Sequence, residues 1–435
     1  MIQQGASHAF CFVWYTKRTI RVQYINMKQS FTPSEEILAK YAELIVKFGM
    51  QNRAGKKLEK GSVIRFTVPE AAKPLYYHLQ QAILKNGHHP LGHFVPSSDQ
   101  TYNFEKNFFD HANQAQINYF DIKREKGMTS QIDGSIHILA TTAPHALKEV
   151  DSKKVLQRSV AMKKAKEIRF KKINEGKLQW TIALYGTDEM AKEAGMSPKA
   201  YWEQIIHACY LDTANPVAEW TKINKEVQTT AKKLTKLEIK SVHVIGSDID
   251  LTIGIGKDRA WRAGGGNNIP SYEVFTSPNY REVNGWAKFN QPHYRYGKKI
   301  EGIELTFKDG VVIASKATKN HDLLQSMLNT DGGNRLGEFS LTDAKLSRIT
   351  KSMAEILYDE NIGGAYGNTH VALGSAYRDC YICDIQAVKE SEWDKLGYNE
   401  SVVHSDIIST TNRTVTATLY NGKTKVIYTD GHFTL

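Results

Sequence analysis

Six side chains in the C-terminal part of the sequence are of the types that bind hydrolytic metal ions. They are four carboxylates and two histidines: Glu273, Glu338, Glu360, His370, His404 and Asp406. Carboxylate oxygens and imidazole nitrogens are the donors of hydrolytic zinc, cobalt or manganese sites. Six such groups suit two divalent ions that share a bridging carboxylate and activate a water between them. The set therefore predicts a metal-dependent hydrolase.

The spacing of these residues does not by itself establish such a site. They spread from Glu273 to Asp406 without the local pattern of a His-Glu-x-x-His helix. Each also has a structural alternative: Glu273 as a surface strand residue, Glu360 as a carboxylate at a helix end, and His370 as a hydrogen-bonded core histidine. The His404-x-Asp406 pair is a better signal, because alternate residues of a strand share a face.

Seven segments, taken in order, resemble a known family. They are Gly246-Ser-Asp-Ile-Asp-Leu251, Trp261-Arg-Ala-Gly-Gly-Gly-Asn267, Tyr272-Glu-Val-Phe-Thr-Ser-Pro278, Gly337-Glu338, Leu357-Tyr-Asp-Glu-Asn361, His370-Val-Ala-Leu-Gly-Ser-Ala-Tyr377 and His404-Ser-Asp406. Together they resemble the thermophilic metalloaminopeptidases of the aminopeptidase T, aminopeptidase S and PepS type. The resemblance runs from about Met27 to the C-terminus and is specific from Gly246 to Asp406.

The resemblance implies two divalent metal ions per chain and a peptide substrate with a free N-terminus. It also implies a homodimer with enclosed active sites. In the implied ligand set, one ion is held by Glu273, His404 and Asp406, the second by Glu360 and His370, and Glu338 bridges the two. Zinc, cobalt and manganese remain open as the native metal.

Two residues are expected to act in catalysis. Tyr377 resembles the active-site tyrosine of the family, and its hydroxyl could stabilise a tetrahedral oxyanion. Glu338 could handle the proton of the attacking water as well as bridge the ions, and the sequence does not separate these roles. The chain departs from the family between Glu360 and His370, where it is longer and rich in glycine. The extra residues either bulge outward or remove Glu360 from the ligand set.

The elements that must position these residues change in character near residue 240. Before it, strands at 63–68, 135–140 and 180–185 alternate with helices expected at 34–48, 71–84, 153–169, 185–194 and 198–210. This alternation predicts an α/β domain with a largely parallel sheet. Beyond it, a half-buried strand at 249–255 and hairpins at 303–313 and 415–428 predict an α+β, mainly antiparallel, metal-binding domain. We therefore expect an α/β domain over 27–240 and a catalytic domain over 241–435.

The composition excludes several other classes of protein. The chain has 435 residues, with 24% charged and 41% hydrophobic residues, as in a globular protein. Four cysteines are too few for a disulfide scaffold and suit the cytoplasm. No apolar stretch reaches the roughly 18 residues of a membrane helix. Residues 1–26 lack the charge order of a signal peptide and are expected to be an N-terminal extension, disordered or absent from the natural protein.

The net charge of +11 raises the alternative of a nucleic-acid-binding protein. Residues 151–177 carry ten Lys or Arg against three Asp or Glu, and 222–240 is a second basic stretch. Apolar residues at helical spacing within 151–177 favour a solvated helix instead, so no nucleic-acid partner is expected. A dimetal hydrolase of another amide or of a phosphoester is the other open alternative.

Three further motifs are expected to be structural. Gly264-Gly-Gly266 lacks the Lys-Ser/Thr of a phosphate loop and predicts a turn near the site. Cys380 and Cys383 have no second metal-binding pair at a matching interval and are expected to be free thiols. His88-His89-Pro90 with His93 is expected to form a turn after the second helix.

Overall fold

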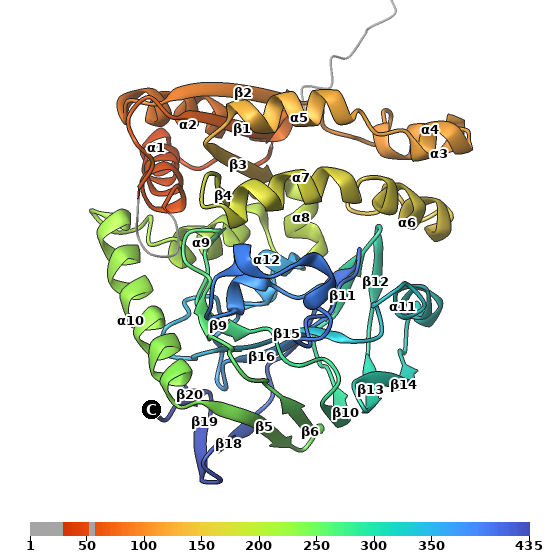
Figure 1. Cartoon of the computed structure of the whole chain (residues 1–435). Helices are drawn as coiled ribbons and strands as arrows, with labels where there is room; N and C mark the ends of the chain where they lie inside the picture. The colour runs from red at the N-terminus through yellow and green to blue at the C-terminus, as the bar shows by residue number, and fades with distance from the viewer. Residues whose placement is uncertain (1–28, 52–56) are drawn as a thin grey trace, which may run out of the picture.

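The computed structural model describes residues 29–51 and 57–435, and the expected extension 1–26 lies outside them. The N-terminal half is built around a parallel five-stranded sheet, in the order β2-β1-β3-β4-β8. Its strands are β1 (Val63–Pro69), β2 (His89–Val95), β3 (Gly134–Leu139), β4 (Gln179–Leu184) and β8 (Asn268–Ile269). Figure 1 shows this sheet in the upper half of the molecule. The expected α/β architecture is confirmed.

Helices connect and flank these strands. They are α1 (Glu35–Leu44), α2 (Lys73–Lys85), α3 (Phe104–His111), α4 (Gln114–Asn118), α5 (Ile122–Gln131), α6 (Ser152–Ala161), α7 (Lys163–Asn174), α8 (Asp188–Glu193), α9 (Pro198–Ala208) and α10 (Pro216–Lys236). The N-cap hydroxyl of Ser34 accepts the Ile37 N–H and starts α1. Burial along β1 alternates strictly, because one face of the sheet carries the core.

Two expectations about this half are wrong in detail. Residues 89–95 form strand β2 instead of a turn, so the turn after α2 is confined to the residues before His89. Pro90 is tolerated because β2 is an edge strand, where a missing N–H costs little. The single helix expected over 153–169 is divided into α6 and α7 at Met162, whose ψ of −5° departs from the helical value.

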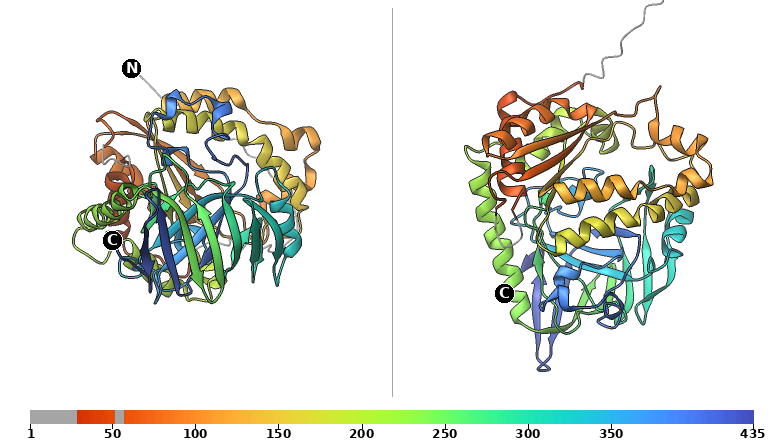
Figure 2. Two further views of the ribbon diagram at one scale, coloured as in Figure 1. Left: turned by 60° about the horizontal axis from the view of Figure 1, so that its bottom comes forward. Right: turned by 45° about the horizontal axis from the view of Figure 1, so that its top comes forward.

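The C-terminal half consists mainly of two antiparallel sheets. One has eight strands in the order β14-β13-β10-β6-β5-β18-β19-β20, and the other has five in the order β17-β16-β15-β9-β7. The five-stranded sheet lies between the N-terminal half and the eight-stranded sheet, whose strands run side by side in the left view of Figure 2. Both expected hairpins are present, as β13–β14 and β18–β19. The antiparallel architecture is thus confirmed.

The strands of the eight-stranded sheet are β5 (Ile239–Gly246), β6 (Ile249–Gly254), β10 (Val283–Lys288), β13 (Glu304–Lys308), β14 (Val311–Lys316), β18 (Arg413–Leu419), β19 (Thr424–Thr429) and β20 (His432–Phe433). Those of the five-stranded sheet are β7 (Arg262–Ala263), β9 (Glu273–Thr276), β15 (Leu336–Thr342), β16 (Asn368–Gly374) and β17 (His404–Ser409). The remaining elements are β11 (His293–Arg295), β12 (Lys298–Ile300), α11 (His321–Leu328) and α12 (Ile356–Asp359).

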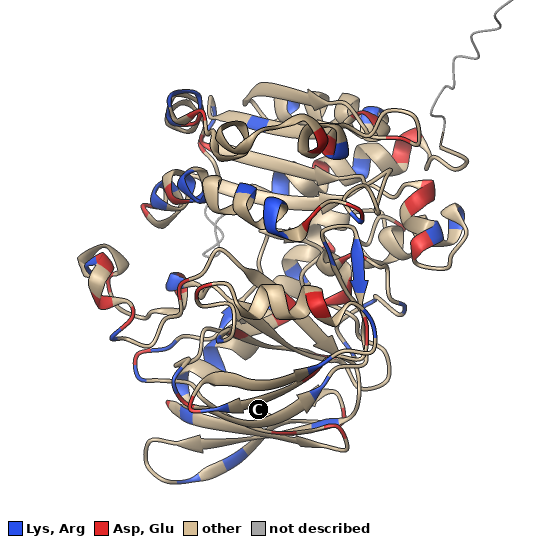
Figure 3. Cartoon of the chain, turned by 90° about the vertical axis from the view of Figure 1, so that its right-hand side faces the viewer, with Lys and Arg blue, Asp and Glu red and all other residues tan. Residues whose placement is uncertain are grey.

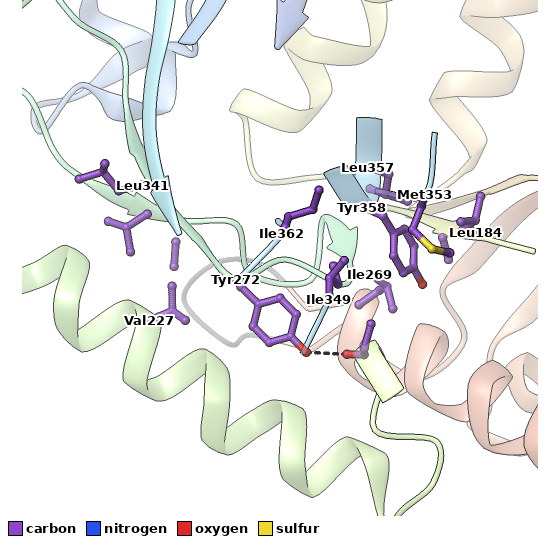
Figure 4. Close-up of a cluster of buried hydrophobic side chains, with 14 of the residues drawn as sticks. Leu184, Val227, Ile269, Tyr272, Leu341, Ile349, Met353, Leu357, Tyr358 and Ile362 are labelled. Atoms are coloured by element: carbon purple, nitrogen blue, oxygen red, sulfur yellow. Dashed lines mark hydrogen bonds between the residues drawn. The ribbon is translucent and has the colours of Figure 1, made fainter. Parts of the chain in front are cut away.

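One hydrophobic core runs through both halves, from Leu38 of α1 to Tyr428 of β19. Figure 4 shows the part where β4, α10 and β15 meet, with Tyr272 at its centre. The Tyr272 hydroxyl donates to the carbonyl of Ala208 at 2.7 Å, which joins the site-bearing segment to α9. The continuous core fixes the N-terminal half against the sheet that carries the metal-ligand candidates. None of the helices described is both long and apolar enough to cross a membrane.

Candidate metal centre

The register of the five-stranded sheet gathers five of the six predicted ligands on one face. Glu338 of β15 lies opposite Ala372 of β16, which lies opposite Asp406 of β17. His370 pairs with Ser340, two residues beyond Glu338, and Glu273 pairs with Thr342, two residues further. Because side chains alternate between faces, all these positions point the same way. His404 shares this face, two residues before Asp406.

The side chains of these residues converge into two overlapping groups. Ligand atoms of Glu273, Glu338 and His370 lie within 4.8 Å of one another, and so do those of Glu338, His404 and Asp406. Glu338 belongs to both groups, as the expected bridge would. The distances between ligand atoms group Glu273 with His370. The family resemblance implies instead that Glu273 binds the same ion as His404 and Asp406.

Both histidines are held from outside in the orientation that a metal ligand needs. The Nδ1 of His404 lies 2.8 Å from the carbonyl of Ser375, and that of His370 lies 3.4 Å from Oδ1 of Asn368. A proton on each Nδ1 leaves the Nε2 lone pair free for an ion. The fully buried Nε2 of His370 has no hydrogen-bond partner, although it faces Glu273 at 3.4 Å and Glu338 at 3.6 Å. A cation between these atoms would satisfy all three, so the residues fit a metal ion.

The electrostatics of the cluster also favour a cation. Burial and the neighbouring charge of Glu338 raise the pKa of Glu273 to about 7. Burial and the charge of Glu273 raise the pKa of Glu360 well above its ordinary value. Despite burial, the imidazole of His404 holds the pKa of Asp406 below its usual range. The six candidates thus comprise four buried carboxylates and two imidazoles, and the excess negative charge is what divalent ions neutralise.

Glu360 reaches the site from a different element. It caps the C-terminus of α12, lines the same pocket, and accepts a hydrogen bond from Asn268 at 3.0 Å. It is absent from both groups of converging ligand atoms, so it lies at the margin of the cluster.

Tyr377 lies beside the cluster, as expected for a catalytic group. Its ring packs against those of His404, with centroids 5.0 Å apart, and Phe275 at 5.6 Å. Its backbone N–H donates to the hydroxyl of Ser277 at 2.8 Å, which fixes the turn that presents the ring. Burial, followed by the charge of Glu338, raises the pKa of Tyr377 well above its ordinary value, so the phenol keeps its proton.

The pocket over the cluster also contains residues that the sequence did not single out. Trp180 of β4 and Phe275 of β9 supply apolar wall, and Asn267 and Asn268 supply amides. Gly264, in the predicted turn, is part of the lining, and a Cβ there would lie 1.7 Å from the Ser271 hydroxyl. Trp180 could not be found from the sequence, because nothing distinguishes it from an ordinary strand residue.

Side chains of β11 hold the outer edge of β17. The Nδ1 of His293 lies 3.1 Å from the carbonyl of Asp406, and Nη1 of Arg295 donates to the carbonyl of His404 at 3.1 Å. β17 is the edge strand of its sheet, so these side chains stand where a further strand would pair. The two ligand candidates of β17, His404 and Asp406, are therefore fixed by their main chain as well as by the sheet.

A buried face of carboxylates and histidines, with each imidazole fixed from outside, defines the site of a metal-dependent enzyme. Residues 34–433 match the thermophilic metalloprotease family (M29), and the chain belongs to this family. The resemblance seen in the sequence is thereby confirmed.

Individual relatives match along most of their length. Aminopeptidase 2 of Geobacillus stearothermophilus is 26% identical over 420 residues, covering 92% of this chain and 98% of the relative. Aminopeptidase T of Thermus aquaticus is 26% identical over 397 residues, covering 85% and 91% respectively. The solved structure of wild-type AmpT from Thermus thermophilus superposes with a TM-score of 0.77 at 24% identity, covering 92% of this chain and all of that chain, and so has the same fold.

Proposed function

We propose that this chain is a metal-dependent aminopeptidase that hydrolyses the first peptide bond of peptides. The observation that carries the proposal is the single buried face on which Glu338 joins two groups of potential ligands. The relatives named aminopeptidases support the choice of bond. We further propose two divalent ions per chain, of zinc, cobalt or manganese, a homodimer with enclosed sites, and a cytoplasmic location. The free thiols of Cys209 and Cys383 agree with that location.

In the proposed site the ligands divide as the geometry groups them. One ion would be bound by Glu273 and His370, with Glu360 at the margin. The other ion would be bound by His404 and Asp406, and Glu338 would be a ligand of both. When bound, such ions supply Lewis acidity that lowers the pKa of water towards neutrality and polarises a carbonyl.

The remaining chemistry is assigned to side chains of the chain. Glu338 accepts the proton of the attacking water and delivers it to the leaving amine. The protonated hydroxyl of Tyr377 donates a hydrogen bond to the oxyanion that forms on the scissile carbonyl. Trp180 and Phe275 line the pocket where the N-terminal side chain would lie, which favours apolar residues there. Because most of the ligand candidates are buried, short or unfolded peptides would be favoured over folded proteins as substrates.

The test is hydrolysis of leucine p-nitroanilide by chelator-stripped protein, before and after addition of Zn²⁺, Co²⁺ or Mn²⁺. Activity should return only with metal. N-acetyl-leucine p-nitroanilide, which lacks the free amine, should remain uncleaved. Cleavage of the acetylated substrate at an equal rate would refute an aminopeptidase, and cleavage of p-nitrophenyl phosphate alone would favour a phosphoesterase.

A further inference from the structure

Glu360 is a buried carboxylate whose hydrogen-bond partners are amides and not cations. Figure 3 shows basic and acidic residues next to one another on helices of the N-terminal half. Glu360, in contrast, is only 6% exposed, and no Lys, Arg or His of the described ranges lies within 4 Å of its oxygens. Burying a carboxylate is costly unless hydrogen bonds or a cation compensate for the lost water. The groups that hold Glu360 therefore matter for what it can bind.

Two amide groups hold one oxygen of this carboxylate. Nδ2 of Asn268 donates to Oε1 of Glu360 at 3.0 Å, and Nδ2 of Asn361 donates to the same oxygen at 3.4 Å. The Asn361 amide also donates to the carbonyl of Leu357 at 3.3 Å, so Asn268 makes the shorter contact to Glu360. Oε2 accepts no hydrogen bond from the residues that the structure describes. Because Glu360 and Asn268 both line the pocket, one oxygen is anchored and the other is available to a ligand there.

Asn268 is itself fixed by the sheet of the N-terminal half. It belongs to the two-residue strand β8, which pairs in parallel with β4 and places Asn268 opposite Ile182. The Ile182 N–H donates to the carbonyl of Asn267 at 2.7 Å. Ile269, the next residue, is fully buried and lies in the same hydrophobic cluster as Tyr358 of α12 (Figure 4). The amide of Asn268 therefore has a defined position next to the end of α12.

The same end of α12 is also connected to His370. Nδ2 of Asn368 donates to the carbonyl of Asp359 at 2.8 Å, and Oδ1 of Asn368 lies 3.4 Å from Nδ1 of His370. Glu360 follows Asp359 directly in the chain. Because the ligand atoms of His370 group with those of Glu273, a change in the position of Glu360 concerns this group of the cluster.

We propose that Asn268 is a positioning residue of the metal centre: its amide anchors Oε1 of Glu360 and leaves Oε2 for the ion that Glu273 and His370 would bind. The inference rests on the proposed function and adds a residue that acts only through Glu360. Hydrogen bonds to a ligating carboxylate commonly change metal affinity 10- to 100-fold. Because Asn268 lies on β8, the contact also connects the sheet of the N-terminal half to the metal centre.

The experiment is a metal titration of the full chain after its metal has been removed. Zn²⁺ is competed against a chromogenic chelator to resolve a tighter and a weaker binding step, and loading with Co²⁺ is followed by visible absorption. For Asn268→Leu we expect one of the two steps to weaken about tenfold and the other to change less than twofold. Asn268→Ala, which adds no apolar side chain to the pocket, should behave in the same way. Wild-type affinity in both steps, or equal weakening of both, would overturn the inference.

A double-mutant cycle separates positioning from a merely structural role. Glu360→Ala should weaken the same step and change the Co²⁺ spectrum in the same way as Asn268→Leu. Adding Asn268→Leu to Glu360→Ala should then change the affinity less than twofold further, because Asn268 acts through Glu360. Effects of the two substitutions that multiply, or a Glu360→Ala variant that binds both ions normally, would contradict the proposed role.

Asn412→Leu is the matched control. Nδ2 of Asn412 donates to Oδ1 of Asp430 at 2.8 Å, so this variant also removes an amide–carboxylate hydrogen bond, but at an exposed position. Both binding steps should stay as in the wild type, and equal weakening in Asn412→Leu and Asn268→Leu would overturn the inference. The melting temperature of each metal-free variant checks that it is folded.

Metal activation separates this inference from the proposed function. With leucine p-nitroanilide, Asn268→Leu should need about tenfold more metal than the wild type for half-maximal activity, and saturating metal should restore most of kcat. If the wild type cleaves the substrate and Asn268→Leu responds to metal identically, only the positioning role is wrong. If nothing is cleaved with any metal, the proposed function fails, whereas selective loss of one binding step in Asn268→Leu would still support the positioning role.

Discussion

Glu338→Gln tests the core of the proposed mechanism. The substitution keeps the shape of the side chain and removes its charge, at the residue shared by both groups of ligands. The carboxylate oxygens lie 3.6 Å from Nε2 of His370 and 3.5 Å from Nε2 of His404. At 3.5 Å and an effective dielectric constant near 20, a unit charge pair is worth about 5 kcal/mol. The affinity for cations in this cluster should therefore fall steeply.

The catalytic loss should be larger than the loss of binding alone. Removing a general base costs about 10²- to 10⁴-fold in rate, and incomplete metal loading adds to this. We expect kcat/KM for leucine p-nitroanilide to fall at least 10³-fold, which corresponds to about 4 kcal/mol of transition-state stabilisation. Metal content after dialysis, measured by atomic emission, should fall below the wild-type stoichiometry.

The assay needs a check that the variant is folded. Its circular dichroism spectrum should match that of the metal-free wild type, and Glu301→Gln, on the surface between β12 and β13, should keep full activity. A Glu338→Gln protein that retains both its metal and more than a tenth of wild-type kcat/KM would refute the shared role of this carboxylate.

Three further predictions concern residues around the cluster. Tyr377→Phe should lower kcat for leucine p-nitroanilide about a hundredfold with little change in KM, because it removes one oxyanion donor; an unchanged kcat would exclude that role. His293→Leu should weaken metal binding about tenfold in a chelator competition, because the main chain of Asp406 loses a partner; wild-type affinity would contradict this. Burial and then Asp359 raise the pKa of Glu355 from 4.5 to about 7. The protonated Glu355 carboxyl therefore contributes stability that is lost as the pH rises from about 4.5 to 7. Glu355→Gln should reduce the fall in melting temperature between pH 5 and pH 8. The control, Glu203→Gln at an exposed position of α9, should leave that fall unchanged. An identical fall in both variants would contradict the assignment.

The local patterns of the sequence predict the sheets well because they depend on periodicity. Alternation in 249–255, 303–313 and 415–428 corresponds to strands of the eight-stranded sheet. The His404-x-Asp406 spacing likewise places both side chains on one face of a single strand. Their meeting with Glu273, Glu338 and His370 depends on the register of four strands, which no local pattern encodes. The family motifs supplied that part of the prediction.

The sequence does not predict contacts that cross between the halves of the molecule. Trp180 reaches the pocket because β8, a strand of two residues from beyond residue 240, pairs with β4. Lys163 of α7 likewise forms an ion pair with Glu400 of the C-terminal half at 2.6 Å. Such contacts come from tertiary packing, and neither strand β8 nor the sequence around Glu400 carries a pattern that indicates a partner.

The segment between Glu360 and His370, expected to be longer than in the family, leaves Glu360 in the lining of the pocket. Asn361 follows Glu360 directly and is held in place, because its side-chain oxygen accepts a hydrogen bond from the Tyr272 N–H at 2.6 Å. Residues 364–366 are exposed, and Gly367 returns the chain with a φ of 63° at a point where a Cβ would lie 2.1 Å from the Tyr428 hydroxyl. Residues 364–366 are therefore where we expect the outward bulge, one of the two alternatives open in the sequence. Because Glu360 lines the pocket, its spacing to His370 is no argument against Glu360 as a proposed ligand.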